Sequence, residues 1–154
     1  MANPRSERSG RARSLSRRLV LQALYQWQMT GQTFSELRNQ FATDEGYPEV
    51  DPEYFEQLLR GVLEDATDLD AMLAEWLDRP VVQLDPVEHA VLLIGLQELR
   101  QHPEVPYRVV LNEGVELAKK FGATEGHKFI NAVLDRAARN LRAAEQAAAR
   151  APRG

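Results

Sequence analysis

Apolar residues recur every three or four positions along most of this chain, which is the spacing of amphipathic helices rather than of strands. A first helix is predicted to begin near Ser14 or Ser16 and to end at Gly31. Its apolar stripe consists of Val20, Ala23, Leu24 and Trp27. Residues 1–13 carry no such stripe and are rich in Arg and Ser, so we expect them to form a disordered basic arm.

Capping residues mark where the next helices begin. Thr33 and Glu36 have the spacing of a capping box and predict a short second helix. Residues 44–50, which include glycine and proline, are expected to form a loop. An N-cap aspartate followed by proline then predicts the start of two longer helices, at Asp51-Pro52 and at Asp85-Pro86.

The second half of the chain continues the helical pattern. Thr67 is a cap-like residue and suggests a bend or restart there, and residues 90–99 are apolar on nearly every side, as in the middle of a bundle. Gly122 is placed to end the helix that follows, and Thr124 is placed to cap the last one. Residues 143–154 are mostly Ala and Arg and are expected to fray into a tail.

The whole pattern predicts an all-α protein. No segment alternates as a strand, and no repeat of fixed period is found. We therefore expect a compact bundle of about seven helices, with residues 14–142 forming a single all-helical domain between the arm and the tail.

Composition excludes several classes of protein. The 154 residues include no Cys, which excludes disulfide scaffolds, thiolate zinc sites and cysteine nucleophiles. The longest apolar stretch, residues 90–96, is far shorter than the ~20 residues of a membrane helix. The N-terminal arginines are not followed by an apolar signal region, so a cytoplasmic location is expected.

The charge is divided unevenly along the chain. Residues 1–18 contain six arginines and only one acidic residue, Glu7, a net charge of +5. The total is −4, so the remaining residues carry −9. A basic segment joined to an acidic body is typical of proteins that bind nucleic acid, because the local positive potential attracts the polyanion.

Two places have residue types that suit RNA. Arg18, Gln22 and Tyr25 share one face of the first helix, where the tyrosine either stacks on an unpaired base or packs against a neighbouring helix. Residues 122–129 do not have the spacing of a phosphate loop. Lys128 nevertheless lies beside the backbone N–H groups of a helix start, which favour phosphate.

Catalysis is not expected. His89, His102 and His127 are scattered, and none has metal-ligand spacing. The acidic residues between 64 and 70 are interpreted as a solvated helix face rather than as an acid–base pair. The sequence therefore predicts no catalytic residue, no metal and no cofactor.

Three segments resemble the NusB family of antitermination factors: 21-LQALYQWQ-28, 51-DPEYFEQLLRGV-62 and 105-VPYRVVLNEGVELAKKFGATEGHKFINAVLD-135. The resemblance covers roughly residues 13–141. It implies two packed three-helix sub-bundles. It also implies a function in transcription antitermination, in which the protein binds single-stranded boxA RNA of ribosomal RNA leader transcripts. The implied partners are a small-subunit ribosomal protein, known as Nus factor E, and the RNA polymerase antitermination complex.

The resemblance also implies where the partners bind. RNA contacts are expected near the N-terminus at Arg13, Arg17, Arg18 and Tyr25, and at the start of the last helix at Glu125, His127, Lys128 and Phe129. The charge and face arguments add Arg11 and Gln22 to this set. The two regions would have to meet in the fold. The ribosomal protein is expected at Glu88, with Tyr107 nearby.

Two other interpretations stay open at this stage. One is a protein-only interaction module or homodimer, in which the arm is only a solubilising segment. The other is a stand-alone relative of the RNA-binding domain of ribosomal RNA cytosine methyltransferases. Those enzymes continue into a cofactor-binding domain that this chain lacks, so a free-standing factor is preferred.

Overall fold

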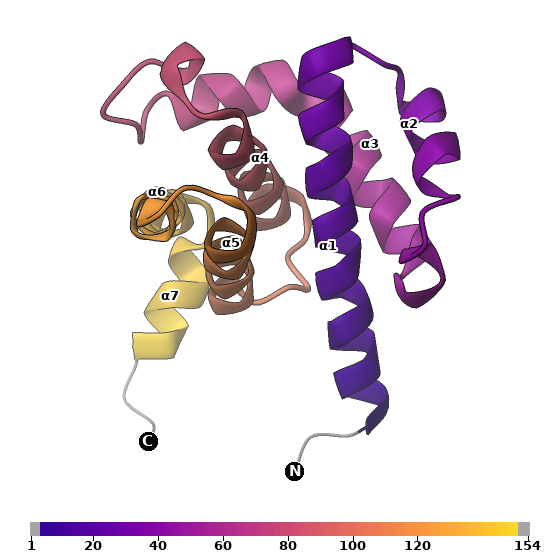
Figure 1. The fold of residues 1–154 in the computed structure, drawn as a ribbon. Coiled ribbons are helices and arrows are strands. Elements are labelled where there is room, and N and C mark those ends of the chain that lie inside the picture. Colours follow the sequence, from indigo (N-terminus) through magenta and orange to yellow (C-terminus); the bar gives the residue numbers. More distant parts are fainter. Residues whose placement is uncertain (1–3, 151–154) are drawn as a thin grey trace. The chain divides into compact units, whose positions relative to one another are not determined.

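The computed structural model describes the backbone of residues 4–150 and the side chains of residues 7–149, and it is helical from end to end (Figure 1). Its helices are α1 (Pro4–Thr30), α2 (Phe34–Phe41), α3 (Pro52–Leu73), α4 (Pro86–Gln101), α5 (Tyr107–Phe121), α6 (Gly126–Leu141) and α7 (Ala143–Arg150), with two short 3-10 turns, η1 (Tyr47–Glu49) and η2 (Val81–Gln83). Residues 4–150 contain no strand. The prediction of an all-α fold with about seven helices is confirmed.

The chain divides into two compact units. Unit 1 comprises Met1–Ala66 and unit 2 comprises Thr67–Gly154, so the division falls within α3. Unit 1 holds α1, α2 and most of α3, and unit 2 holds α4 to α7. This division agrees with the two sub-bundles that the resemblance implies. The single domain over residues 14–142 stays a prediction.

The first helix starts ten residues before the predicted position. α1 begins at Pro4, so the residues of the basic arm from 4 onward are helical, and only residues 1–3 of it lie outside the description. Proline suits the first turn of a helix because its missing N–H would have no partner there, and Glu7 favours the same turn. Gly10 costs the helix only about 1 kcal/mol and does not interrupt it.

Helix caps and hydrogen bonds of one buried serine stabilise the helices of unit 1. Both hydrogen bonds of the predicted capping box between Thr33 and Glu36 are present. The Oγ of Ser16 on α1 accepts from the Asp51 amide N–H at 3.0 Å, and it has the carbonyl oxygens of Ala12 at 2.9 Å and Asp51 at 3.1 Å as acceptors for its single hydrogen. Asp51 in turn caps α3 by accepting from the Tyr54 amide N–H. Ser16 therefore fastens the start of α3 to α1.

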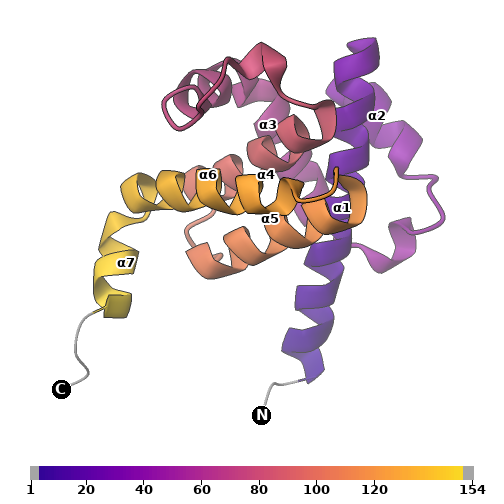
Figure 2. The ribbon, with the colours of Figure 1, turned by 60° about the vertical axis from the view of Figure 1, so that its left-hand side comes forward.

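Unit 2 is built on close contacts between α4, α5 and α6, which lie side by side (Figure 2). α4 is buried on every side over residues 90–99, as predicted. A Cβ added at Gly95 on α4 would come within 2.7 Å of the Leu134 side chain, and one added at Gly114 on α5 within 2.8 Å. The two glycines therefore let Leu134 of α6 insert between the helices.

Besides the start of α1, some predicted boundaries were right and others were wrong. α1 ends before Gly31, which has φ +70°, and α5 ends before Gly122. No helix restarts at Thr67, because α3 continues through it to Leu73, and the predicted bend stays a prediction. The N-cap residue of α6 is Glu125 rather than Thr124.

The boundary predicted for the C-terminal tail was also wrong. Residues 143–150 form helix α7, and only residues 151–154 of the predicted tail lie outside the description. Alanine has the highest helix propensity of all residues. Arg142 is buried where α7 begins, which fixes the first turn of this helix in place.

Candidate nucleic-acid interface

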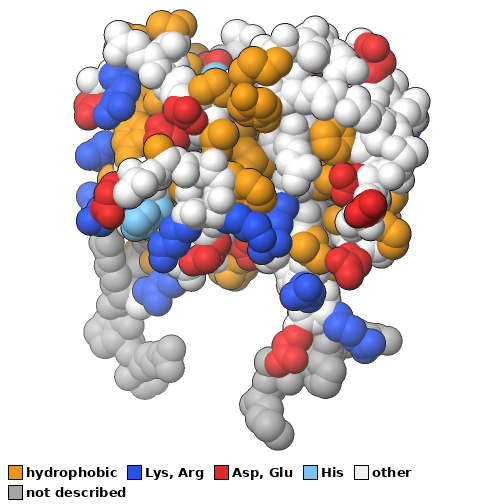
Figure 3. Space-filling view, in the orientation of Figure 1, with side chains coloured by type: hydrophobic (Ala, Val, Ile, Leu, Met, Phe, Trp, Pro, Cys, Tyr) orange, Lys and Arg blue, Asp and Glu red, His pale blue; other side chains and the backbone are white. Residues whose placement is uncertain are grey.

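The predicted RNA-binding residues of α1 separate onto two faces of the helix. Arg11, Arg18, Gln22 and Tyr25 follow one another at intervals of seven, four and three residues, so they line one side; we call them the exposed stripe. Arg11, Gln22 and Tyr25 are exposed and Arg18 is half-buried. Figure 3 shows Lys and Arg side chains along the N-terminal turns of α1.

The other two arginines face the interior of unit 1. The Arg13 guanidinium lies 4.5 Å from the centre of the Tyr54 ring, and that of Arg17 lies 5.5 Å from it. Both distances suit cation–π interactions. Only 2% of Arg17 and 2% of Tyr54 is exposed. Arg17 therefore belongs to the core of the unit, and its prediction as a phosphate contact is not supported by its burial.

Tyr25 is open to a ligand. The side chain is 45% exposed, which favours the stacking interpretation over packing against a neighbouring helix. One helical turn further on, Met29 is 56% exposed and extends the stripe with an apolar side chain. The sequence analysis did not select Met29, although it shares the face of Gln22 and Tyr25.

The second predicted region lies in unit 2, at the start of α6. Glu125 adopts the left-handed conformation with φ 69°, which is uncommon outside glycine. Its carboxylate forms an exposed ion pair with the Lys128 Nζ at 2.5 Å. Exposed pairs of this kind contribute little to stability, so a phosphate group could replace the carboxylate at low cost. His127 and Phe129 are half-buried beside them.

The predicted protein contact Glu88 lies at the same place. A Cβ added at Gly126 would come within 2.9 Å of the Glu88 Oε1, so only glycine admits the carboxylate this close to the backbone. Burial raises the pKa of Glu88, the negative charge of Asp85 raises it further, and Arg79 opposes both effects. Glu88 is thus an acidic group that the fold has partly desolvated.

Arg79 is the residue that sequence reasoning missed in this region. Its guanidinium lies 4.7 Å from the centre of the Phe129 ring, and its Nε donates to the Asp78 carboxylate at 2.9 Å. We call Arg79, Glu88, Gly126 and Phe129 the α6-start cluster. The sequence contained one signal that could have identified Arg79, because it is the only Lys or Arg between Arg60 and Arg100.

Tyr107 does not lie near Glu88. Glu88 is in the first turn of α4, whereas Tyr107 begins α5 and is connected through Glu145 and Arg142 to the last turn of α4. The ten residues from Glu88 to Glu98 span about 15 Å of helix. The expectation that the two residues are neighbours is therefore wrong.

The two predicted RNA regions belong to different units, so the prediction that they meet stays a prediction. Within the described residues, no group of three or more His, Asp or Glu side chains is arranged to hold a metal ion. The described helices include none with the length and apolar character to cross a membrane.

The chain is similar to known proteins over most of its length. The profile described as the NusB family matches residues 14–139. The transcription antitermination protein NusB of Hahella chejuensis is 49% identical over 138 residues, which cover 90% of this chain and 93% of the relative.

Solved structures have the same fold. The NusB structure of T. maritima superposes with a TM-score of 0.74 at 26% identity, over 91% of this chain and 94% of the other. The structure of antitermination factors NusB and NusE in complex with dsRNA gives a TM-score of 0.70 at 22% identity, over 80% of this chain and 93% of that one. From the profile match and the identity to its relative, we conclude that this chain belongs to the NusB family.

Proposed function

We propose that this chain is a non-catalytic, cytoplasmic transcription antitermination factor that binds single-stranded, boxA-like RNA of ribosomal RNA leader transcripts. It acts with a small-subunit ribosomal protein, Nus factor E, within the RNA polymerase antitermination complex. RNA binds along the exposed stripe of α1 in unit 1, and the ribosomal protein binds unit 2.

The observation that carries the RNA proposal is the exposed stripe itself. Arg11 and Arg18 present cations, Gln22 presents an amide that can read a base edge, and Tyr25 presents an aromatic ring, all on one side of one rigid helix. Phosphate contacts supply affinity, and stacking with base-edge contacts supplies selectivity for unpaired nucleotides. Arg13 and Arg17 support this surface from behind by fixing the helix against Tyr54.

The ribosomal-protein proposal depends on charge. Unit 2, residues 67–154, holds 13 Asp and Glu against 11 Lys and Arg, a net charge of −2, and Glu88 in the α6-start cluster is a partly desolvated carboxylate. A ribosomal protein is commonly basic, so opposite potentials would steer the two together. A structural neighbour was solved as NusB and NusE in complex with dsRNA, which supports RNA and a NusE-type protein as the classes of partner for this chain.

The test is fluorescence anisotropy of a labelled boxA-like RNA with the full chain at low salt, with and without Nus factor E. We expect binding that Nus factor E strengthens. An unlabelled single strand should compete better than its duplex, because Tyr25 can stack only on unpaired bases. The duplex arm is needed because the related complex contains dsRNA.

A matched pair of variants localises the contact. Arg11→Gln with Arg18→Gln removes two cations from the exposed stripe, whereas Arg38→Gln with Arg60→Gln removes two cations that lie over Phe34 in the same unit. Only the first pair should weaken RNA binding strongly. No RNA binding by the wild-type chain together with Nus factor E would refute the proposal, and equal losses in both pairs would refute the assignment to the stripe.

A further inference from the structure

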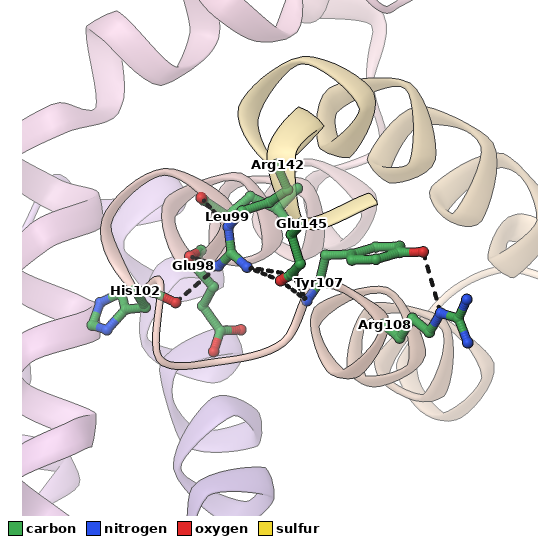
Figure 4. Close-up of polar contacts among 7 residues, drawn as sticks. All are labelled: Glu98, Leu99, His102, Tyr107, Arg108, Arg142 and Glu145. Carbon is green, nitrogen blue, oxygen red and sulfur yellow. Dashed lines mark hydrogen bonds and ion pairs between the residues drawn. The ribbon is translucent and has the colours of Figure 1, made fainter. Parts of the chain in front are cut away.

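Two arginines that are removed from solvent differ in how the fold satisfies them. Arg142 is buried at the junction of α6 and α7, where three carbonyls at the end of α4 and the Glu145 carboxylate accept its hydrogen bonds (Figure 4). Arg13 on α1 is half-buried, and its buried Nε has no hydrogen-bond partner among the described residues. Most buried polar groups in folded proteins do have a partner. Arg13 therefore has hydrogen-bonding capacity that unit 1 leaves unused.

Arg13 lines a small recess in the surface of unit 1. The other lining residues, Asp51, Glu53, Tyr54 and Gln57, come from the start of α3 and the residue before it. The recess is open to solvent and has a volume of about 180 Å³. Sites for drug-sized ligands have roughly 300–1,000 Å³. The recess therefore suits one small group, such as a single nucleobase.

The recess combines a cation with hydrogen-bond acceptors. The Arg13 guanidinium lies 4.5 Å from the centre of the buried Tyr54 ring, which holds the cation in place. Asp51 is already engaged, because its Oδ1 accepts from the Tyr54 amide N–H at 3.1 Å. Glu53 is exposed, and its Oε1 lies 3.4 Å from the Gln57 Nε2. Glu53 is therefore the carboxylate that a ligand can reach.

This set of groups favours a base over a phosphate. Two carboxylates beside one arginine would repel an anion, whereas an unpaired base is neutral and presents both donors and acceptors along its edges. Guanine has two neighbouring acceptors, O6 and N7, which arginine can bind together. Its N1–H and 2-amino group are donors that suit a carboxylate. Guanine is thus the base whose two edges match Arg13 and Glu53.

We infer that the recess is a subsite for one unpaired guanine base, in which Arg13 donates to O6 and N7 and Glu53 accepts from N1–H and the 2-amino group. The inference rests on the proposed function and adds a base preference to it. Arg13 follows Arg11 by two residues, about 200° around the helix, so the recess lies on the other side of α1 from the exposed stripe. The recess is therefore a second contact, separate from the stripe.

The test compares single-stranded RNAs that differ at one base. Each probe is a labelled oligouridine of about twelve nucleotides with guanosine or inosine at its centre. Inosine keeps the O6, N7 and N1–H of guanosine and lacks only the 2-amino group. Anisotropy titrations at low salt give the affinity of each probe for the full chain as wild type, Glu53→Ala and Glu64→Ala.

Glu64→Ala is the matched control. Glu64 is also an exposed glutamate of α3, and it does not line the recess. Its position eleven residues after Glu53 places it about 16 Å along the helix. The readout is the ratio of the two affinities, because loss of a carboxylate strengthens the binding of any polyanion.

We expect the wild type to bind the guanosine probe about tenfold more tightly than the inosine probe, the scale of one hydrogen bond to a charged group. Glu53→Ala should reduce this ratio to less than about twofold, and Glu64→Ala should keep it. Competition with guanosine monophosphate identifies the source of the base. Displacement of the probe by this nucleotide, but not by inosine monophosphate, would make a free nucleotide a ligand of the recess, and no displacement would assign the base to an RNA strand.

Two results would overturn the inference alone. One is equal affinity of the wild type for the guanosine and inosine probes. The other is a guanosine preference that Glu53→Ala retains, since the preference would then arise elsewhere in the chain. Both results leave RNA binding along the exposed stripe intact. A wild-type chain that binds neither these probes nor boxA-like RNA with Nus factor E would instead refute the proposed function, and the inference with it.

Discussion

Arg17 and Arg18 are adjacent in the sequence and face opposite environments. Arg17 is buried and, with the half-buried Arg13, lies over the Tyr54 ring, whereas Arg18 lies on the exposed stripe with Arg11. The net charge of residues 1–18 therefore overstates the number of cations that a bound ligand could contact. The helical period divides the cations between a structural face and a binding face.

The comparison predicts that substitutions of the two neighbours differ in how much they lower stability. Arg17→Ala removes a buried side chain and its cation–π contact, and it should lower the free energy of unfolding by about 2–3 kcal/mol. Arg18→Ala should change it by less than about 0.5 kcal/mol. Urea unfolding followed by circular dichroism measures both. Similar losses in the two variants would remove the distinction between the faces.

The next largest effect is expected for a substitution on the exposed stripe, and it concerns RNA affinity. Tyr25→Ala should weaken binding of single-stranded RNA by about 1–2 kcal/mol, roughly 5- to 30-fold, because a stacking surface is lost. Tyr25→Phe keeps the ring and should bind nearly as the wild type does. Anisotropy titrations measure the affinities. If Tyr25→Phe lost as much as Tyr25→Ala, the hydroxyl rather than the ring would be the contact.

The smallest effect is expected for Glu88 in unit 2, and it concerns the pH dependence of stability. The pKa of Glu88 is raised from its ordinary value of 4.5 in the folded chain, chiefly by burial. The folded state therefore binds this proton more tightly than the unfolded chain does. The contribution of Glu88 to stability should fall as the pH rises from about 4.5 through the raised pKa, and then stay level. Unfolding curves against pH should show this decline in the wild type and lack it in Glu88→Gln.

Local signals in the sequence predicted much of the fold. The capping box of Thr33 and Glu36 and the caps at Asp51 and Asp85 act within one helical turn, so the residues involved are neighbours in the sequence. The start of α1 was misplaced because residues 4–13 lack apolar periodicity, although nothing in them except Gly10 opposes a helix.

The candidate site was only partly predictable. The exposed stripe follows from the helical period, and so does the separation of Arg13 and Arg17 from it. Their contact with Tyr54 joins two different helices, and no local pattern reveals it. The contact of Glu145 with Tyr107 is equally remote, since the two are 38 residues apart in the chain.

The most direct test of the central claim, that the exposed stripe of α1 contacts RNA phosphates, is the salt dependence of RNA binding. The logarithm of the affinity falls with the logarithm of salt concentration by about 0.7 per phosphate contact on a single strand. The Arg11→Gln, Arg18→Gln double variant should therefore have a slope shallower by about 1.4 than the wild type. The Arg38→Gln, Arg60→Gln control should keep the wild-type slope. An unchanged slope in the stripe variant would contradict the account.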